Sequence, residues 1–352
     1  MPKPFRTALV TATCALLLVA CGSDTPATTN TNAPAATTTT IVAATSTTEP
    51  SSEATTTAPA TTPTAPAGET RVIASSFGDV TVPAKPVRVV ALDYAAAVMV
   101  EYGLTPVGTT ELYEEDHSPE LWAGLADIPV VGEWTSIDGL NYEAIAAQRP
   151  DMIVGLVRAN QADSDELVTL LSPIAPTVLF AANGSQDVLD VTVQIADAVG
   201  VGAQAAADRD AFVARAGELT TMYGEQLASL RFALINAYDE TEFVVYTPQS
   251  WWGPLFDAIG ATMVPLTDKV DDNGVWLSVE QIGQLDEASV VLYGLDGGDP
   301  RDAVASVLDS PLYQALPVAA HTFGIANLFP DRYTTARAGL DELAAILDQL
   351  AG

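Results

Sequence analysis

Two glutamates at matched positions form the pattern that most clearly implies chemistry. Glu143 lies in the segment Asn141–Ile145, and Glu280 occupies the same place in Ser278–Ile282. Each segment offers a helix-capping residue, a glutamate two positions into a helix, an isoleucine and then a buried strand. A single carboxylate in the first turn of a helix is favoured by the helix dipole and needs no partner. Two carboxylates at equivalent places favour a docking role instead.

Metal ligands and catalytic groups are scarce. The only histidines are His117 and His321, whereas direct zinc or manganese sites use several histidines and carboxylates. His117 follows an acidic loop, residues 111–116, that could bind a cation loosely, although a solvated loop is the better interpretation. The chain has neither a Gly-x-Ser-x-Gly elbow nor a His-Glu-x-x-His zinc motif. We therefore expect a protein without a bound metal or cofactor that is not an enzyme.

The N-terminus resembles a bacterial lipoprotein signal. Lys3 and Arg6 precede an apolar run that is too short to span a bilayer, and small residues lead to Cys21. This pattern predicts a signal peptide over residues 1–20, with Cys21 lipidated as the first mature residue. The chain would then be extracytoplasmic and anchored to the outer face of the cell membrane through its lipid. An ordinary signal peptide with a chance cysteine is the alternative.

Residues 21–69 consist mostly of Thr, Ala, Pro and Ser, and large apolar residues are rare. A segment of this composition cannot bury a core, which predicts a disordered stalk. The whole chain has a formal net charge of −31, and loss of Lys3 and Arg6 with the signal makes it more negative. This charge excludes nucleic acid and anionic lipid surfaces as expected partners.

The remaining residues, 70–352, alternate short apolar runs with helical patterns, which predicts an α/β fold with largely parallel sheets. A proline-free helical stretch, Gly202–Leu230, is long enough to bridge two lobes. We expect an N-terminal lobe over residues 70–201, a linker helix over 202–230 and a C-terminal lobe over 231–352. The expected strands are Arg88–Leu92, Met152–Leu156, Thr177–Phe180, Phe232–Ala237, Val244–Tyr246 and Val290–Tyr293.

Several motifs in order carry a resemblance to a known family. They are Phe77–Val90, Gly103–Gly108, Asn141–Glu143 with Arg149–Val154, Ser310–Val318 and a closing helix, Ala338–Leu350. The combination resembles the substrate-binding proteins of ABC importers for ferric siderophores, haem and vitamin B12, known as class III. The resemblance covers essentially all of residues 70–352.

The resemblance implies two Rossmann-like α/β lobes joined by a single long rigid helix, with the ligand in the cleft between the lobes. It also implies that Glu143 and Glu280 form salt bridges with arginines of the two permease subunits. The expected partners are therefore the ABC permease with its ATPase, a small ligand, and the membrane through the lipid on Cys21. Carboxylate–guanidinium pairing supplies both orientation and binding energy at such a docking face.

The ligand cleft should be lined by loops at the carboxyl ends of strands. Aromatic residues in such loops suit a flat or bulky aromatic ligand, and a guanidinium suits an anionic iron chelate. The candidates are Tyr94, Trp134, Arg158, Tyr246, Gln249, Trp251, Trp252, Trp276 and Arg332. One of Trp251 and Trp252 should face the core, because adjacent residues seldom share a side. For Arg332, pocket lining and a surface ion pair with Asp331 or another neighbour are equally good interpretations.

A ferric siderophore fits this histidine-poor chain best, because its own donors already saturate the iron. Haem remains open, since a tyrosine can serve as its axial ligand, and so does vitamin B12. Abundant carboxylates could hide a glycosidase pair, although no run of eight barrel units is present. A surface-tethered hydrolase and an adhesion module remain distant alternatives.

Overall fold

The computed structural model describes residues 69–114, 117–159, 163–268, 272–296, 298–326 and 329–351. They belong to one compact unit, Pro63–Gly352. The predicted signal peptide, Cys21 and all of the predicted stalk except Glu69 lie outside the described residues. Within the described ranges, no helix is both long and apolar enough to cross a membrane.

The N-terminal lobe is built on a parallel four-stranded sheet with the order β4-β3-β5-β6. Its strands are β3 (Val89–Leu92), β4 (Gly108–Thr109), β5 (Met152–Arg158) and β6 (Thr177–Ala182). A separate antiparallel hairpin, β1 (Thr70–Ser75) and β2 (Gly78–Pro83), precedes the sheet. The helices of this lobe are α1 (Ala95–Glu101), α2 (Pro119–Leu125), α3 (Tyr142–Ala147), α4 (Ser164–Leu171), η2 (Ser185–Asp187) and α5 (Val188–Ala198). Apolar side chains from alternate strand positions form one core cluster on each face of the sheet.

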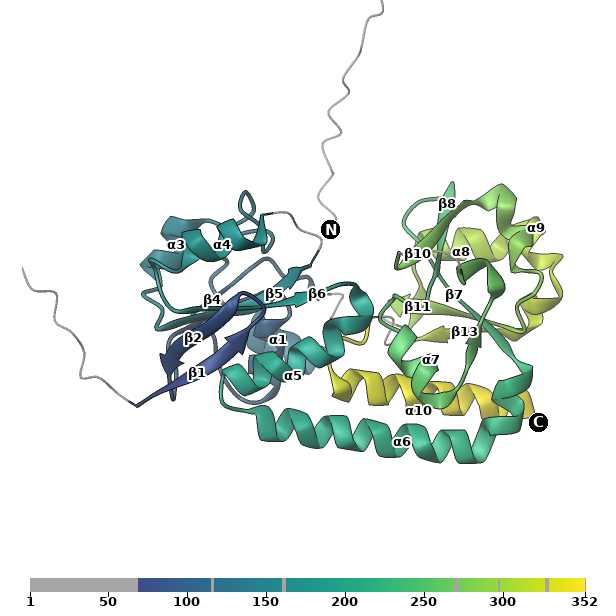
Figure 1. The fold of residues 1–352 in the computed structure, drawn as a ribbon. Helices are drawn as coiled ribbons and strands as arrows, with labels where there is room; N and C mark the ends of the chain where they lie inside the picture. Colours follow the sequence, from purple (N-terminus) through teal and green to yellow (C-terminus); the bar gives the residue numbers. More distant parts are fainter. Residues whose placement is uncertain are drawn as a thin grey trace, which may run out of the picture. The chain divides into compact units, whose positions relative to one another are not determined.

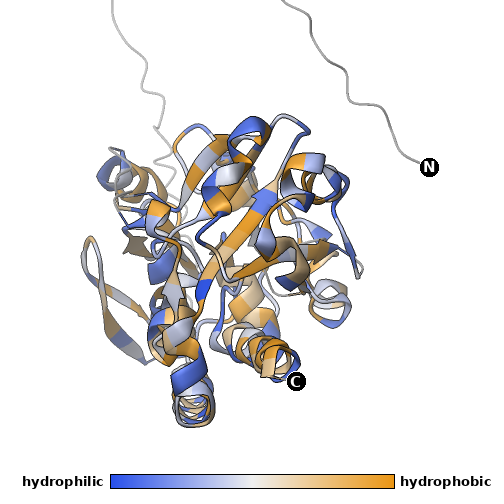
Figure 2. Cartoon of the chain, turned by 90° about the vertical axis from the view of Figure 1, so that its right-hand side faces the viewer, coloured by the Kyte–Doolittle hydropathy of each residue, from blue (hydrophilic) through white to orange (hydrophobic). Residues whose placement is uncertain are grey.

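The C-terminal lobe is built on a mixed seven-stranded sheet. Its strand order is β10-β8-β7-β11-β12, and in addition β13 pairs with β11 and β9 pairs with β7. Its strands are β7 (Arg231–Ala237), β8 (Glu242–Tyr246), β9 (Thr262–Met263), β10 (Gly274–Ser278), β11 (Val290–Asp296), β12 (Asp299–Pro300) and β13 (Thr322–Ile325). Its helices are α7 (Gly253–Ile259), η3 (Pro265–Thr267), η4 (Val279–Leu285), α8 (Asp302–Asp309), α9 (Pro311–Gln314), η5 (Pro317–His321) and α10 (Tyr333–Ala351). Figure 2, which looks toward this lobe, shows hydrophobic residues along its strands and hydrophilic residues on many outer loops.

All six predicted strands are present, and each differs from its prediction by a few terminal residues. The prediction of largely parallel sheets is confirmed for the first sheet and needs correction for the second. β8 pairs antiparallel with both β7 and β10. The four residues between β7 and β8 are too few for a parallel crossover, so the chain must turn back as a hairpin.

The long helix α6 (Gly202–Ser229) links the two lobes, and α10 packs beside it (Figure 1). α6 contacts α5 of the first lobe and α7 of the second. Its buried face comprises Ala205, Phe212, Ala216, Leu219, Tyr223 and Leu227. Val213 and Met222 share its helical pattern but are exposed, because they lie on the flanks of the helix, beside the buried face.

The repeated segments take the same form in the two lobes. Asn141 caps α3, and Ser278 caps η4 through a capping box with Gln281. The glutamate that follows each cap is exposed in a first helical turn. The isoleucine two positions further on is buried in each lobe's core. Each segment then leads into the strand that lies at the centre of its sheet, β5 or β11.

Loss of the Asn141 cap should lower the free energy of unfolding by about 1 kcal/mol. The Asn141 side-chain oxygen accepts a hydrogen bond from the Ala144 backbone N–H at 3.0 Å, and Asn141→Ala leaves that donor without its capping partner. Urea unfolding followed by circular dichroism measures the change. Asn141→Ser is the control, because serine caps about as well as asparagine. An equal loss of stability in both variants would contradict the capping explanation.

Candidate functional site

The carboxyl ends of the central strands carry polar and aromatic side chains. In the N-terminal lobe, β3 ends immediately before Asp93 and Tyr94, and β5 ends at Arg158. In the C-terminal lobe, β8 ends at Tyr246 and β11 ends at Asp296. In open α/β sheets, ligands bind in crevices outside the carboxyl ends of parallel strands, which here applies to β3, β5 and β11, whereas β8 runs antiparallel to β7.

Asp93 holds an unusual backbone conformation at the end of β3. Its φ of 55° lies in the left-handed region, which aspartate tolerates better than most residues. Its N–H donates to the Thr110 hydroxyl at 2.9 Å. Burial raises the pKa of the Asp93 carboxyl, while the nearby Arg158 guanidinium and a hydrogen bond with Thr135 partly oppose this increase. Arg158 therefore faces a carboxylate of its own lobe.

Three aromatic rings meet between the lobes. The Trp251 ring lies 5.0 Å from the Phe329 ring and 6.4 Å from the Tyr246 ring, and Tyr246 lies 6.2 Å from Phe329. All three pairs meet edge to face, the preferred aromatic geometry. Trp251 packs against core clusters of both lobes, and burial raises the pKa of the neighbouring Tyr94 hydroxyl. We refer to Tyr246, Trp251 and Phe329 as the aromatic cluster.

The aromatic cluster continues outward along the C-terminal lobe. The Tyr246 and Tyr238 hydroxyls are 3.3 Å apart, and the Tyr238 ring lies 5.8 Å from the Trp276 ring. Tyr238 and Trp276 are both more than half exposed. A continuous row of aromatic side chains thus runs from the buried boundary between the lobes to the surface.

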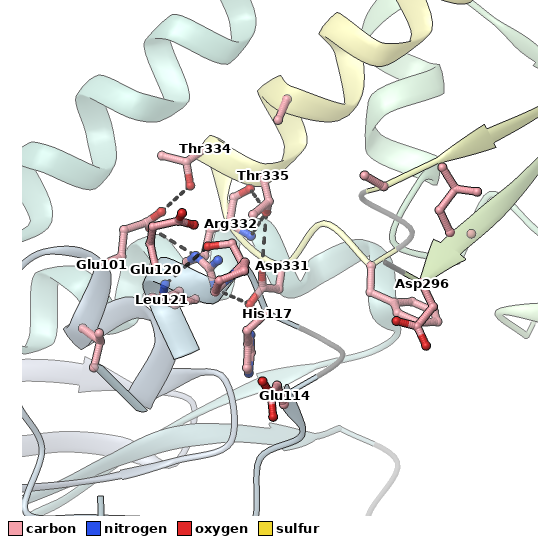
Figure 3. Close-up of a pocket in the computed structure, with 18 of the residues that line it drawn as sticks. Glu101, Glu114, His117, Glu120, Leu121, Asp296, Asp331, Arg332, Thr334 and Thr335 are labelled. Carbon is pink, nitrogen blue, oxygen red and sulfur yellow. Dashed lines mark hydrogen bonds and ion pairs between the residues drawn. The ribbon is translucent and has the colours of Figure 1, made fainter. Parts of the chain in front are cut away.

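A cavity of about 1160 Å³ opens between the lobes beside the aromatic cluster. Its N-terminal wall comes from the end of α1 and the start of α2, and its C-terminal wall comes from the end of β11, Phe329 and the start of α10. We call it the interlobe cavity. Figure 3 shows Glu114, His117 and Glu120 on the N-terminal wall and Asp296 on the other side. Its volume exceeds that of most small-ligand pockets and suits a bulky ligand.

A buried ion-pair network crosses the boundary at the edge of the interlobe cavity. Arg332 lies 3.2 Å from the Glu101 carboxylate of the first lobe and 2.6 Å from the Asp331 carboxylate (Figure 3). The Thr334 hydroxyl donates to Glu101, and the Thr335 hydroxyl donates to Asp331. Burial raises the pKa of Glu101, and Arg332 is the principal opposing influence. The network therefore fixes the start of α10 against the end of α1.

His117 lines the interlobe cavity rather than lying in a fully solvated loop. Its imidazole stacks on Trp122 with ring centroids 6.3 Å apart. Burial lowers its pKa, and Asp331 only partly offsets this effect. Among the described residues, no group of three or more His, Cys, Asp or Glu side chains could hold a metal ion.

Six of the predicted ligand residues line the interlobe cavity, lie near it or are exposed on one lobe. Arg332 lines the interlobe cavity and is also buried in ion pairs with Asp331 and Glu101, so elements of both interpretations hold. Tyr246 and Trp251 contact Phe329, which lines the cavity, and Tyr94 lies next to Trp251. Trp134 and Trp276 are 57% and 53% exposed, on the first and second lobes.

Trp252 needs correction as a ligand residue. Its side chain is 0% exposed and packs on Phe256 in the core of the C-terminal lobe. A side chain enclosed in this way cannot line a cleft. Of the adjacent tryptophans, Trp252 is therefore the one that faces the core. Gln249 is half-buried; its side-chain oxygen accepts from the Thr247 hydroxyl, and its backbone carbonyl accepts from the Gln186 N–H across the boundary.

Sequence reasoning missed several residues around the interlobe cavity. Asp93 directly follows β3 and Phe329 lies in the loop between β13 and α10, but nothing in the local pattern marks either residue. Glu101 ends α1 and meets Arg332 only because the start of α10 lies beside the end of α1. Arg301, just before α8, also lines the cavity. The φ of Asp93 could have been suspected only from its place between a strand and a helix.

A family model described as periplasmic binding protein matches residues 89–322 of the chain. The iron(3+)-hydroxamate-binding protein of Bacillus subtilis is 26% identical over 199 residues, which are 54% of this chain and 56% of that protein. The chain thus spans about half the length of this curated relative.

Solved structures give fuller coverage. The siderophore periplasmic binding protein from the fuscachelin gene cluster of Thermobifida fusca is 31% identical with a TM-score of 0.70, covering 76% of this chain and 98% of that one. A periplasmic solute binding protein from Mycobacterium smegmatis is 21% identical with a TM-score of 0.63, covering 80% and 99%. The second likeness concerns the fold alone.

Proposed function

The chain belongs to the periplasmic binding protein family, and on this premise we propose that it captures a ferric siderophore and delivers it to the permease of an ABC importer. Members of this family bind substrates outside the cytoplasm and are not themselves enzymes. The interlobe cavity carries the proposal, because it combines a volume of about 1160 Å³ with an aromatic cluster at its edge. The siderophore and hydroxamate ligands named for two relatives support the ligand class.

The proposed ligand contacts come from both lobes. Phe329 lines the cavity, Trp251 and Tyr246 pack against it, and Trp276 continues the aromatic row outward. Tyr94 and Arg158 stand at strand ends of the first lobe, outside the described lining of the interlobe cavity. Because a siderophore saturates the iron with its own donors, none of these side chains has to coordinate the metal. We assign no resident cofactor to the protein.

Anchoring and docking complete the proposal. The lipobox-like segment before Cys21 supports attachment to the outer face of the cell membrane through a lipid. The exposed carboxylates of Glu143 and Glu280 support docking to one permease subunit each. The lipid anchor and the two docking carboxylates both leave a bound ligand in the interlobe cavity until the protein reaches the permease.

Tryptophan fluorescence should be quenched at one equivalent of a single type of ferric siderophore. The physical reason is that Trp251 lies within the aromatic cluster, so an iron chelate in the interlobe cavity approaches its ring. The chain is titrated with ferric hydroxamate, ferric catecholate, ferric citrate, haem and cobalamin. Trp251→Phe should reduce the quenching amplitude without abolishing binding.

The same titration decides between the alternatives. Saturation with only haem or cobalamin would retain the importer role and replace the ligand. No binding of any of the five compounds would contradict the proposed function. Chemical conversion of a bound compound would favour a hydrolase instead.

A further inference from the structure

The charges that line the interlobe cavity are strongly unbalanced. Its described lining residues include five carboxylates and two guanidinium groups, and no lysine. They are Glu101, Glu114, Glu120, Asp296 and Asp331 against Arg301 and Arg332. With all of them ionised, the lining carries a formal charge of −3. This imbalance bears on which ferric chelates the cavity accepts.

Arg332 is not available to an anionic ligand. Its side chain is 7% exposed and lies between two carboxylates, 3.2 Å from Glu101 and 2.6 Å from Asp331. Two carboxylates around one guanidinium leave the network with a net negative charge. Any anion that used Arg332 would have to displace one of these buried partners and leave that carboxylate without its counter-charge.

The remaining cations do not restore the balance. Arg301 is the other guanidinium among the described lining residues, which also include Glu114, Glu120 and Asp296. These three carboxylates are exposed to the cavity and have no ion pair among the described residues. His117 adds no positive charge near neutral pH, because burial lowers its pKa. Arg158 lies outside the cavity lining, close to Asp93.

The aromatic cluster is compatible with a positive ligand. Phe329 borders the cavity, with Tyr246 and Trp251 packed around it. Aromatic faces attract cations through their quadrupole, and ammonium groups are often held between rings and carboxylates. The charge of the lining therefore sets the favoured sign of the ligand, and aromatic rings beside it can hold an ammonium group.

We propose that the interlobe cavity selects ferric chelates of neutral or positive net charge and disfavours anionic ones. This inference rests on the proposed function and narrows its ligand class. Three singly charged hydroxamates neutralise a ferric ion, whereas three doubly charged catecholates leave a trianion. The favoured class is thus the trihydroxamates, above all those with a pendant ammonium group. The disfavoured class comprises tris-catecholates and ferric citrates.

Three chelates with one iron centre test the charge directly. Ferric desferrioxamine B has a pendant ammonium, its N-acetyl derivative is neutral, and its N-succinyl derivative has a pendant carboxylate. We expect affinity to fall in that order, by about tenfold or more from the cation to the anion at low salt. At physiological ionic strength the difference should shrink to a few-fold, because the lining carboxylates are exposed and screened. Fluorescence titration at both salt concentrations measures each affinity.

A charge-neutralised cavity provides the second measurement. The variant Glu114→Gln, Glu120→Gln, Asp296→Asn removes the three exposed carboxylates while retaining their shape. It should bind the cationic and anionic chelates with nearly equal affinity. The control is Glu225→Gln, Asp257→Asn, Glu287→Gln, whose residues are exposed and do not line the interlobe cavity. This control removes the same charge from the whole chain and should retain the wild-type preference.

The outcomes separate this inference from the proposed function. Equal affinity for the three chelates, or a preference for the succinyl derivative, would overturn the charge selection while leaving siderophore capture intact. If none of the three binds but another ferric chelate does, the net charge of that chelate decides. A neutral or cationic chelate supports the inference, and an anionic one overturns it. If no ferric chelate binds at all, the proposed function fails, and the charge selection fails with it.

Discussion

Replacement of Arg332 by methionine should lower the free energy of unfolding by about 3–5 kcal/mol near neutral pH. Arg332 is the central cation of the network that joins the lobes, with Glu101 at 3.2 Å and Asp331 at 2.6 Å. Methionine fills much of the same space but leaves the two carboxylates without their counter-charge. An unpaired buried charge costs more than the ion pair contributed, which makes this the most damaging single change we expect in the network.

The loss should depend on pH in a defined direction. Burial raises the pKa of Glu101 above its ordinary value, and Arg332 opposes that increase. A carboxyl with a raised pKa in the folded state favours folding at low pH, and that advantage is lost as the pH rises through the folded-state pKa. Without Arg332 the pKa rises further. The free energy of unfolding that Arg332→Met loses relative to the wild type should therefore be small near pH 4. The loss should grow as the pH rises above about 4.3, the ordinary pKa of glutamate.

Guanidinium unfolding of the wild type and the variant at pH 4, 5, 6 and 7 measures this dependence. Arg337→Met is the matched control, because Arg337 lies nearby on α10, the helix that Arg332 directly precedes, and is exposed. Its change should stay within about 0.5 kcal/mol. Adding Glu101→Gln to Arg332→Met should recover part of the lost stability and flatten the pH dependence. A deficit that does not vary with pH would show that lost packing, rather than unpaired charge, is responsible.

The network also illustrates what the sequence could and could not predict. Asp331 is adjacent to Arg332, so their pairing was one of the two interpretations that the local sequence allowed. Glu101 is far away in the chain and meets Arg332 only because α10 begins beside the end of α1. Burial of the pair depends on the same packing. A sequence pattern contains no information about contacts of this kind.

Periodic features were predicted more completely than packed loops. The strands and the linker helix follow from apolar spacing, and the structure contains α6 over Gly202–Ser229 where Gly202–Leu230 was expected. The antiparallel pairing of β8 was missed because apolar runs in buried parallel and antiparallel strands look alike. Trp251 and Trp252 were recognised as pointing to opposite sides, but only the packing of α7 decides that Trp252 is enclosed.

His117 shows how composition can mislead. An acidic neighbourhood in the sequence is typical of a solvated loop, yet the His117 ring stacks on Trp122 at the wall of the interlobe cavity. Trp122 itself packs against the N-terminal core, as its place in a helical pattern predicts. The cavity as a whole could not be predicted, because its two walls come from segments that only the tertiary fold brings together.

Removing both proposed docking carboxylates should abolish uptake while leaving ligand affinity unchanged. Glu143 and Glu280 are exposed in equivalent first helical turns, each following a capping residue and preceding a buried isoleucine. Neither residue lines the interlobe cavity. Loss of one partner from a charge pair that is buried on binding costs about 2 kcal/mol or more. Glu143→Ala with Glu280→Ala should therefore weaken docking by about a hundredfold at least.

The measurement compares two quantities on the same protein. Uptake of radioactive ferric siderophore is followed in cells that carry the variant in place of the wild-type gene, and affinity is measured by fluorescence titration of the purified chain. The matched control is Glu166→Ala with Glu287→Ala, which removes one exposed glutamate from each lobe. Glu166 also lies in the first turn of a helix, so the control preserves the local setting.

The single variants add a further constraint. If each glutamate contacts a different permease subunit, Glu143→Ala and Glu280→Ala should each reduce uptake, and their effects on docking free energy should be close to additive. Glu143→Arg should be more harmful than Glu143→Ala, because it places like charges together at the docking face. Normal uptake in the double alanine variant would contradict the docking assignment. Loss of both uptake and affinity would instead place these carboxylates in the support of the ligand site.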